Sequence, residues 1–231
     1  MHNTVVIPPI FHGHSVNAFF TTKAVQCAVN RLGEFLAVPS GDIYMPVQKH
    51  TDNVMVLDYD RGPKIADAVV TDTRGIFIGV QAADCVPILL FDKRQLVAGA
   101  VHAGWRGTAA SIVKKTIEMM SQRFFTSPAD IIMAIGPSIR GCCYEVGYEV
   151  LDAVTKACGD GDYYMTKGGK YYLDLAGANR QQAVSSGVPA ELIWLSDECT
   201  FCLPEKYYSY RYTKGTTGRQ CGVIGIVQHP G

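Results

Sequence analysis

The sequence lacks any excess of charge of either sign. Its 231 residues contain 21 lysines and arginines against 21 aspartates and glutamates, which gives a formal net charge of zero. A protein that binds nucleic acid or an anionic membrane surface through its charge carries a basic patch or stripe. We therefore expect neither a nucleic-acid partner nor a membrane partner.

Long apolar segments are also missing. No apolar run reaches the ~18 residues that are needed to cross a bilayer. The opening residues, MHNTVVIPPIFHGH, contain no basic segment followed by an apolar core and no small-residue cleavage site, so no signal peptide is predicted. These absences together predict a cytoplasmic location.

Charged residues are few, and repeats are missing. Charged residues make up 18% of the chain and hydrophobic residues 48%, which is typical of a well-packed globular protein and argues against disorder. The longest Gly-rich stretch, 159–170, has the length of a loop or hairpin rather than of an interdomain linker. We predict one domain over residues 1–231.

Cysteine is plentiful by contrast, and its arrangement excludes a disulfide framework. Such a framework is typical of short secreted chains, and this chain is neither short nor visibly secreted. Most of the cysteines lie in apolar segments, where a free thiol packs as a small core residue. We predict core packing for Cys199 and Cys202 as well. These two residues form a lone C-x-x-C motif, and the alternative prediction is a thiol-rich binding or redox module. The eight cysteines are residues 27, 85, 142, 143, 158, 199, 202 and 221.

Runs of β-branched and aromatic residues bounded by turn residues predict strands. Those between 75 and 102 follow one another without an intervening helix, which favours an antiparallel or mixed sheet and an α+β fold. The predicted strands are 67–72, 75–82, 86–91, 96–102, 130–136, 192–195, 207–212 and 221–227. Apolar periodicity predicts helices over 108–124, capped by Thr108 or Ser111, over 145–158, and over 174–186, opened by Asp174.

Three potential metal ligands, His50, Cys85 and His102, stand in loops or beside apolar runs. Two imidazoles and one thiolate suit Zn²⁺ or copper and leave a fourth position for water or substrate. Their spacing is not a short-range metal motif, and each residue alone also suits an ordinary core role. Asp84 needs a partner because a carboxylate in an apolar strand is costly; the partner is a metal-bound histidine, an arginine or a catalytic proton.

Glycine-rich loops carry several arginines. In HAGWRGTAASIV, Arg106 stands just before an expected helix N-terminus, where free N–H groups and the helix dipole suit an anion such as phosphate. A glycine-rich turn with a surface arginine explains the same pattern equally well. The loops 135–147 and 209–220 have a similar character, and the second contains Arg211 and Arg219.

These motifs together resemble a known family. QKH, ADCVPILLFD, VHAGWRGT, IGPSIRGCCYEVG and YYSYRYTKGTTGR occur here in the order found in the laccase-domain or multicopper polyphenol oxidase family, whose members are described as purine nucleoside phosphorylases that also deaminate adenosine. The resemblance spans residues 48–227. It implies an α/β/β/α sandwich with mixed sheets, which is shared remotely with bacterial deamidase toxins that use a Cys–His pair.

The resemblance also implies an activity and a site. The activity is phosphorolysis of adenosine or inosine to the base and ribose 1-phosphate, with nucleoside and phosphate as the small-molecule partners. A single open-site metal, usually Zn²⁺ and with copper reported, also suits hydrolytic deamination of adenosine. The metal-binding and catalytic trio falls on His50, Cys85 and His102. Beyond what the resemblance implies, we predict Asp84 or a metal-bound water as the group that handles the proton, and Gln48, Arg106 and Arg211 as the substrate and phosphate site.

Two positions depart from the family pattern. Lys23 stands where an arginine is usual, in an N-terminal segment that is compressed and lacks the usual Gly-Gly pair. Thr51 replaces the glycine of the usual QxHG motif. Both departures bear on substrate choice and leave the metal trio intact.

Two alternative activities use the same residues. A copper-dependent polyphenol oxidase of the ordinary multicopper type needs many more histidine ligands than the six in this chain. A metal-free hydrolase would use Cys85 as nucleophile and His102 as base, and the metal content of the protein distinguishes it from the phosphorylase.

Overall fold

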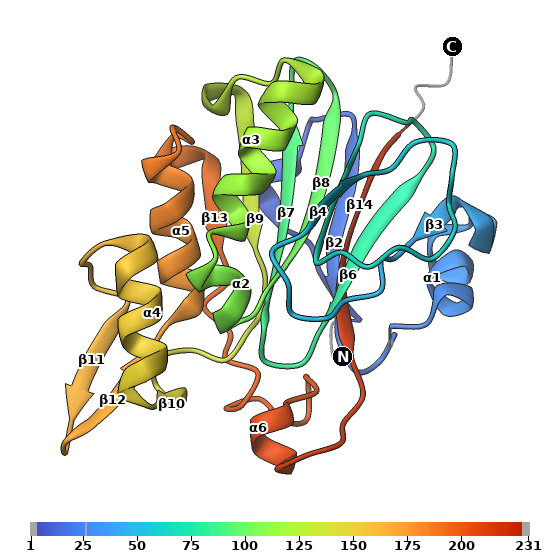
Figure 1. The fold of residues 1–231 in the computed structure, drawn as a ribbon. Helices are drawn as coiled ribbons and strands as arrows, with labels where there is room; N and C mark the ends of the chain where they lie inside the picture. Colours follow the sequence, from blue (N-terminus) through green and yellow to red (C-terminus); the bar gives the residue numbers. More distant parts are fainter. Residues whose placement is uncertain (1–3, 26, 228–231) are drawn as a thin grey trace.

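The computed structural model describes residues 4–25 and 27–227, and its centre is a pair of stacked β-sheets (Figure 1). The first sheet has the strand order β1-β2-β14-β6-β3. Its third strand, β14, is antiparallel to both β2 and β6. The bounds are β1 Val5–Val6, β2 Val16–Thr21, β14 Gln220–Ile226, β6 Phe77–Ala82 and β3 Ile43–Tyr44.

The second sheet has six strands in the order β13-β9-β7-β8-β5-β4. The hairpin β7–β8 and its neighbours β9 and β5 pair antiparallel, whereas both edge pairs are parallel. The prediction of a mixed sheet is therefore confirmed. The bounds are β13 Ile193–Leu195, β9 Ile131–Ile135, β7 Val86–Asp92, β8 Val97–Ala103, β5 Ala68–Thr71 and β4 Val54–Val56.

The apolar run of β7 is explained by burial on both faces. Ile88 and Leu90 belong to the core under the helices, while Leu89 and Phe91 belong to the core between the two sheets. Such two-sided burial is why the strand reads as a continuous apolar run rather than as an alternating pattern.

Helices cover the outer faces of the stack (Figure 1). Helices α2 to α5 lie over the six-stranded sheet, and α1 lies against the five-stranded sheet. The order of layers is the α/β/β/α sandwich that the resemblance implied. The bounds are α1 Val29–Leu36, α2 Trp105–Ala109, α3 Ile112–Phe124, α4 Tyr148–Cys158 and α5 Leu175–Ser185, with short 3-10 turns at Pro9–Phe11, Ser40–Asp42, Pro128–Asp130 and Ala190–Leu192.

A small third sheet lies beside α4 and α5. It has the order β10-β12-β11, with β10 Glu145–Val146, β11 Tyr164–Lys167 and β12 Lys170–Leu173. The Gly-rich stretch 159–170 was predicted as a loop or hairpin, and the β11–β12 hairpin confirms the second form. Within the described ranges, no helix combines the length and apolar character needed to cross a membrane.

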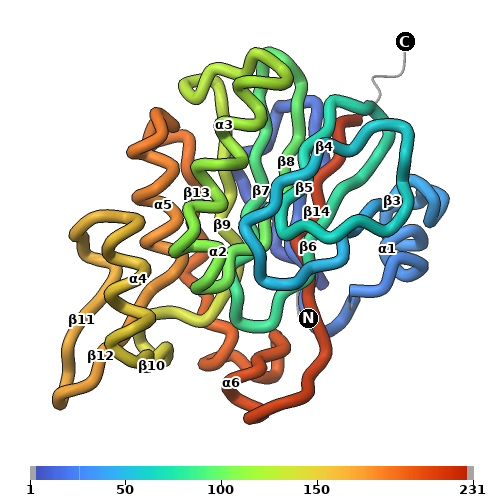
Figure 2. Tube along the Cα trace, in the orientation of Figure 1, coloured from blue at the N-terminus to red at the C-terminus, as the bar shows by residue number. Residues whose placement is uncertain are grey.

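The strand predicted over 207–212 is wrong. Residues Tyr210–Thr213 form the short helix α6, because the Ser209 hydroxyl accepts a hydrogen bond from the backbone N–H of Tyr212. The backbone N–H of Arg211 donates to Asp84 rather than to a neighbouring strand. Helix α6 consequently lies beside the end of the sheets that carries Asp84 (Figure 2).

The helix predicted over 108–124 is divided in two. Ser111 has a left-handed φ of 61°, and it separates α2 from α3 without capping α3 through its side chain. Thr108 does not cap a helix either, because its hydroxyl accepts a hydrogen bond from the Asn179 amide. The other two helices are confirmed, although α4 begins three residues later than predicted; Asp174 accepts hydrogen bonds from two N–H groups at the start of α5.

Candidate active site

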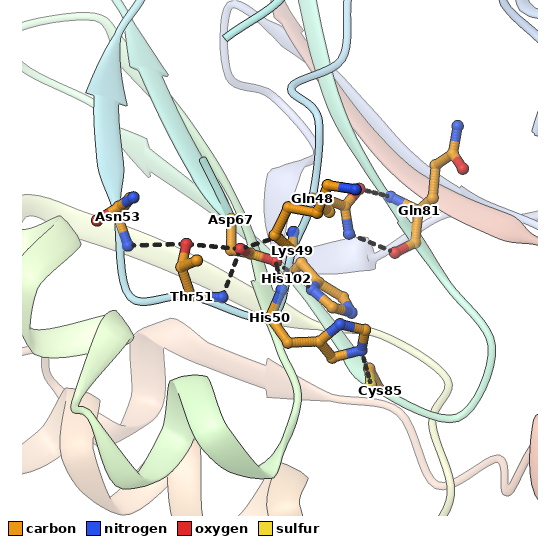
Figure 3. Close-up of polar contacts among 9 residues, drawn as sticks. All are labelled: Gln48, Lys49, His50, Thr51, Asn53, Asp67, Gln81, Cys85 and His102. Carbon is orange, nitrogen blue, oxygen red and sulfur yellow. Dashed lines mark hydrogen bonds and ion pairs between the residues drawn. The ribbon is translucent and has the colours of Figure 1, made fainter. Parts of the chain in front are cut away.

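The predicted trio meets at one edge of the six-stranded sheet (Figure 3). Cys85 directly precedes β7, and His102 lies near the end of β8, where it is paired with Pro87. His50 lies in the loop between β3 and β4. One ligand atom from each of the three residues lies within 4.8 Å of the other two. The fold therefore brings together three residues whose separation in the sequence does not form a metal-binding motif.

The register of the sheet explains this convergence. Because β7 and β8 are antiparallel neighbours, the start of one lies beside the end of the other. The strand β5 is antiparallel to β8, and β4 is parallel to β5. The segments that precede β4, β5 and β7 and the end of β8 consequently share one edge.

Asp67, directly before β5, is the residue that the sequence interpretation missed. Its carboxylate is fully buried, and its Oδ1 lies 2.8 Å from Nδ1 of His102. The same carboxylate accepts hydrogen bonds from the backbone N–H groups of Lys49, His50 and Thr51 at 2.7 to 3.2 Å (Figure 3). Asp67 thus fixes the orientation of one histidine and the loop that carries the other, which is the usual role of a carboxylate behind a metal-binding histidine.

The departure at Thr51 adds to this network. The Thr51 hydroxyl donates a hydrogen bond of 2.7 Å to Oδ2 of Asp67, in addition to the bond from its backbone N–H. A glycine at this position would retain only the backbone donor. Thr51 therefore adds a donor to the buried carboxylate without disturbing the trio.

The loop that follows β8 approaches the trio closely at Gly104. A Cβ atom on this residue would lie 3.1 Å from Sγ of Cys85 and 3.2 Å from Cδ2 of His50. Both distances are tighter than ordinary van der Waals contact. The glycine of the HAGW segment is consequently required by the space between two of the trio's side chains.

Cys85 and His102 shift each other's pKa values. Burial raises the pKa of the Cys85 thiol, but the charge and hydrogen bond of His102 and the hydrogen bond of His50 outweigh it and lower the pKa to about 6. Burial lowers the pKa of His102, whereas the Cys85 thiolate and Asp67 raise it to about 9. In the metal-free protein, a thiolate and an imidazolium therefore coexist between these two values.

This charge pair predicts the reactivity of the metal-free protein. The thiolate forms above its pKa, so we expect the rate of Cys85 alkylation by iodoacetamide to rise with pH, with a midpoint near pH 6. The measurement uses protein from which metal has been removed, and peptide mass spectrometry follows the alkylation. His102→Gln removes the positive partner, and we expect the midpoint to move up by more than one pH unit. A midpoint near pH 9 in the unsubstituted protein would contradict the ion pair.

Asp84, next to Cys85, is held by an arginine, one of the partners considered from the sequence, but through the backbone N–H of that residue, and also by a threonine that was not considered. Its Oδ1 accepts a hydrogen bond from the Thr200 hydroxyl and its Oδ2 from the backbone N–H of Arg211, both at 2.7 Å. Its φ of 81° is a left-handed conformation that is uncommon outside glycine. Asp84 therefore joins the trio to two segments near the C-terminus, and its role as a catalytic acid stays a prediction.

A cavity of about 820 Å³ opens beside the trio and contains the other predicted site residues. The guanidinium of Arg106 lies over the Trp105 ring, 4.4 Å from its centroid, and that of Arg211 lies over the Tyr144 ring at 5.0 Å. Gln48 also lines the cavity, but its side-chain amide exchanges two hydrogen bonds with the backbone of Gln81. The remaining lining residues are Pro46, Val47, His50, Ala82, Ala83, Asp84, Cys85, His102, Tyr210 and Arg219.

Known proteins are similar to this one in sequence and fold. The sequence is 36% identical over 209 residues to purine nucleoside phosphorylase YlmD of Geobacillus stearothermophilus, covering 84% of this chain and 76% of the relative. It is 38% identical over 197 residues to adenosine deaminase RL5 of an unknown prokaryotic organism, covering 80% of this chain and 75% of the relative. The crystal structure of YlmD from Geobacillus stearothermophilus has a TM-score of 0.88 at 32% identity, covering 95% of this chain and 94% of that one.

The family itself is recognised over nearly the whole chain. A family profile described as "Multi-copper polyphenol oxidoreductase laccase" matches residues 15–227. The match includes the trio, Asp67 and the arginines of the cavity. This protein therefore belongs to the multi-copper polyphenol oxidoreductase laccase family.

Proposed function

We propose that this protein is a purine nucleoside phosphorylase that cleaves adenosine or inosine with inorganic phosphate and also deaminates adenosine. The observation that carries the proposal is one cavity in which the His50, Cys85 and His102 trio faces stacked arginine–aromatic pairs. The relatives named as purine nucleoside phosphorylase and as adenosine deaminase support the same two activities.

The arginines suit the phosphate. In phosphorolysis a phosphate oxygen bonds to C1′ of the ribose, the bond from C1′ to the purine nitrogen breaks, and the purine takes up a proton. The side chains of Arg106 and Arg211 line the cavity and are held by ring stacking on Trp105 and Tyr144. A guanidinium held in this way presents its planar donors to phosphate oxygens. Neighbouring aromatic side chains offer apolar faces for the purine.

The trio is the proposed metal site of the reaction. Its two imidazoles and one thiolate fit Zn²⁺, with Cu²⁺ as the alternative, and the bond from Asp67 leaves Nε2 of His102 available as the ligand. When bound there, the ion would supply Lewis acidity for polarising substrate or activating water. Asp84 accepts hydrogen bonds from the Thr200 hydroxyl and from the backbone N–H of Arg211. We propose that it positions Arg211 at the cavity and ties it to the loop that contains Thr200.

A multicopper oxidase activity has little support from the site. Among the described residues, only the trio combines histidine with other potential ligands in one group. Multicopper chemistry requires several such groups close together. The family description alone therefore does not assign phenol oxidation to this protein.

Chromatography of reaction products tests the proposal. Purified protein is incubated with adenosine or inosine in the presence and absence of phosphate. We expect free base and ribose 1-phosphate only with phosphate, and inosine and ammonia from adenosine in either condition. If no nucleoside reacts under any of these conditions, the phosphorylase proposal is wrong and amide or ester substrates become the next test.

Arg106→Ala tests the phosphate site. Loss of a charge-assisted, two-pronged contact is worth about 1.5–3 kcal/mol, so we expect the KM for phosphate to rise about 10- to 100-fold with a smaller change in kcat. Steady-state rates at varied phosphate measure both. Arg94→Ala is the control, since Arg94 pairs with Asp130 on the surface and its loss should leave KM unchanged. An unchanged KM in Arg106→Ala would remove the assigned role.

A further inference from the structure

A second group of thiols lies outside the trio. Cys142 and Cys143 belong to the loop 136–144 after β9, and Cys199 and Cys202 to the loop 196–209 after β13. One sulfur from each of the four residues lies within 4.8 Å of the others. The lone C-x-x-C of the sequence therefore has a second pair, the adjacent cysteines of the other loop.

Core packing does not explain this group. Cys199 is buried, but Cys142 and Cys202 are exposed and Cys143 is half-buried, so the core role predicted for Cys202 is wrong. The strands β9 and β13 are parallel neighbours, and a bridge between Ser138 and Cys199 continues their pairing. Parallel strands end at the same edge of a sheet, which is why the two loops meet.

The sulfur spacing suits a tetrahedral metal. With Zn–S bonds of about 2.3 Å, the sulfurs of a tetrahedral site lie about 3.8 Å apart. Sγ of Cys142 lies 3.8 Å from Sγ of Cys202, and Sγ of Cys143 lies 3.2 Å from the same atom. All four thiols are free rather than bridged.

Backbone donors favour thiolate charge at Cys199, whereas burial and the neighbouring thiols raise the pKa of Cys142 and of Cys143, so the four sulfurs lack a counter-charge of their own. Sγ of Cys199 accepts a hydrogen bond of 3.4 Å from the backbone N–H of Arg140, and the backbone N–H groups of Phe201 and Cys202 also bond to this sulfur. The guanidinium of Arg140 is committed to Asp174 and to the carbonyl of Ser196. The loop's own cation is therefore not the counter-charge of the thiols, and a bound soft cation would supply it.

We propose that Cys142, Cys143, Cys199 and Cys202 form a second metal site, a closed four-thiolate site for Zn²⁺. Four protein ligands leave no open position, which is typical of a structural rather than a catalytic ion. The ion joins the loop that continues to Tyr144 with the loop that contains Thr200, the hydroxyl donor to Asp84. It thereby holds one wall of the cavity, and this role does not depend on which substrate the cavity binds.

Metal analysis by mass spectrometry tests the site in full-length protein purified with a thiol reductant. We expect two zinc ions per chain, and one in the double variant Cys142→Ser/Cys202→Ser. Cys27→Ser is the matched control, because this half-buried thiol lies outside both groups, and it should keep two. In a Cys85→Ala background the intact cluster should keep one zinc ion and the double variant none. Unchanged zinc content in the double variant would overturn the proposal.

A second measurement needs no substitution in the cluster. The zinc K-edge X-ray absorption of Cys85→Ala protein should show four sulfur neighbours at about 2.3 Å. Nitrogen atoms among the nearest neighbours of the zinc ion would rule the site out. So would the finding that, in protein purified with a reductant, the four cysteines form disulfide bonds and bind no metal. Neither result depends on nucleoside turnover, so failure of the metal site and failure of the phosphorylase proposal are distinguishable.

Discussion

Replacement of Cys85 by alanine should lower kcat/KM for nucleoside phosphorolysis by at least about 10³-fold, which corresponds to about 4 kcal/mol of transition-state stabilisation. The change removes the only thiol of the trio and leaves His50 and His102 as the remaining candidate ligands. It also removes the negative partner of His102, so the charge at this edge of the sheet changes. Steady-state rates with adenosine and inosine at saturating phosphate measure the loss.

The fold should survive this substitution. Cys85 is half-buried, precedes β7 rather than lying inside it, and packs next to Gly104, so alanine causes no steric conflict. We expect an unchanged far-ultraviolet circular dichroism spectrum and cooperative thermal unfolding. Cys27→Ser should retain activity, which excludes a general effect of losing a thiol. Full activity in folded Cys85→Ala protein would end the proposal for the trio.

Replacement of Asp67 by asparagine should lower zinc affinity at the trio by about 10- to 100-fold, the usual effect of removing a carboxylate behind a metal-binding histidine. The carboxylate lies opposite Nδ1 of His102 and accepts bonds from the loop that carries His50. An amide has only one acceptor oxygen, so it cannot satisfy all of these donors, and it favours the wrong tautomer of the histidine. Competition with a chromophoric chelator measures the affinity.

The control for this prediction is Thr51→Val. It deletes one hydroxyl donor to Asp67 and keeps the carboxylate and the backbone donor. We expect a smaller loss of zinc affinity than in Asp67→Asn, because the carboxylate loses one charge-assisted bond of about 1.5–3 kcal/mol but keeps His102 and the three backbone donors of the loop that carries His50. Activity of Asp67→Asn should recover in part at excess zinc. Zinc affinity equal to that of the unsubstituted protein would show that Asp67 does not position the ligands.

The strands of the central sheets follow the predicted apolar runs closely. The runs 86–91 and 96–102 correspond to β7 and β8 within one residue, because strands buried on both faces are continuous apolar segments. The N-terminal elements were not predicted: β3 has only two residues, and β2 alternates too weakly to be distinguished from a loop. The segment of the short helix α6 was predicted as a strand because aromatic residues such as Tyr210 and Tyr212 are enriched in strands.

The trio was named from the sequence through its family resemblance, whereas Asp67 and the four-cysteine group were not. The signal for Asp67 was present, since it stands at the edge of an apolar strand just as Asp84 does. Nothing in the local pattern shows which of the two acids meets His102. Likewise, adjacent cysteines at 142 and 143 and a C-x-x-C nearly sixty residues later carry no mark of their pairing.

By itself, the sequence determined the family and the strands of the sheet centre, because apolar runs and short motifs are local properties of the chain. The resemblance to that family then pointed to His50, Cys85 and His102 as candidate metal ligands. Only the tertiary structure decided which distant side chains come into contact. Asp67 meets His102 across 35 residues because β5 and β8 pair antiparallel, and Cys143 meets Cys202 across 59 residues because β9 and β13 pair in parallel. Strand order and register are set by packing over the whole molecule, and they bring these segments to one edge of one sheet.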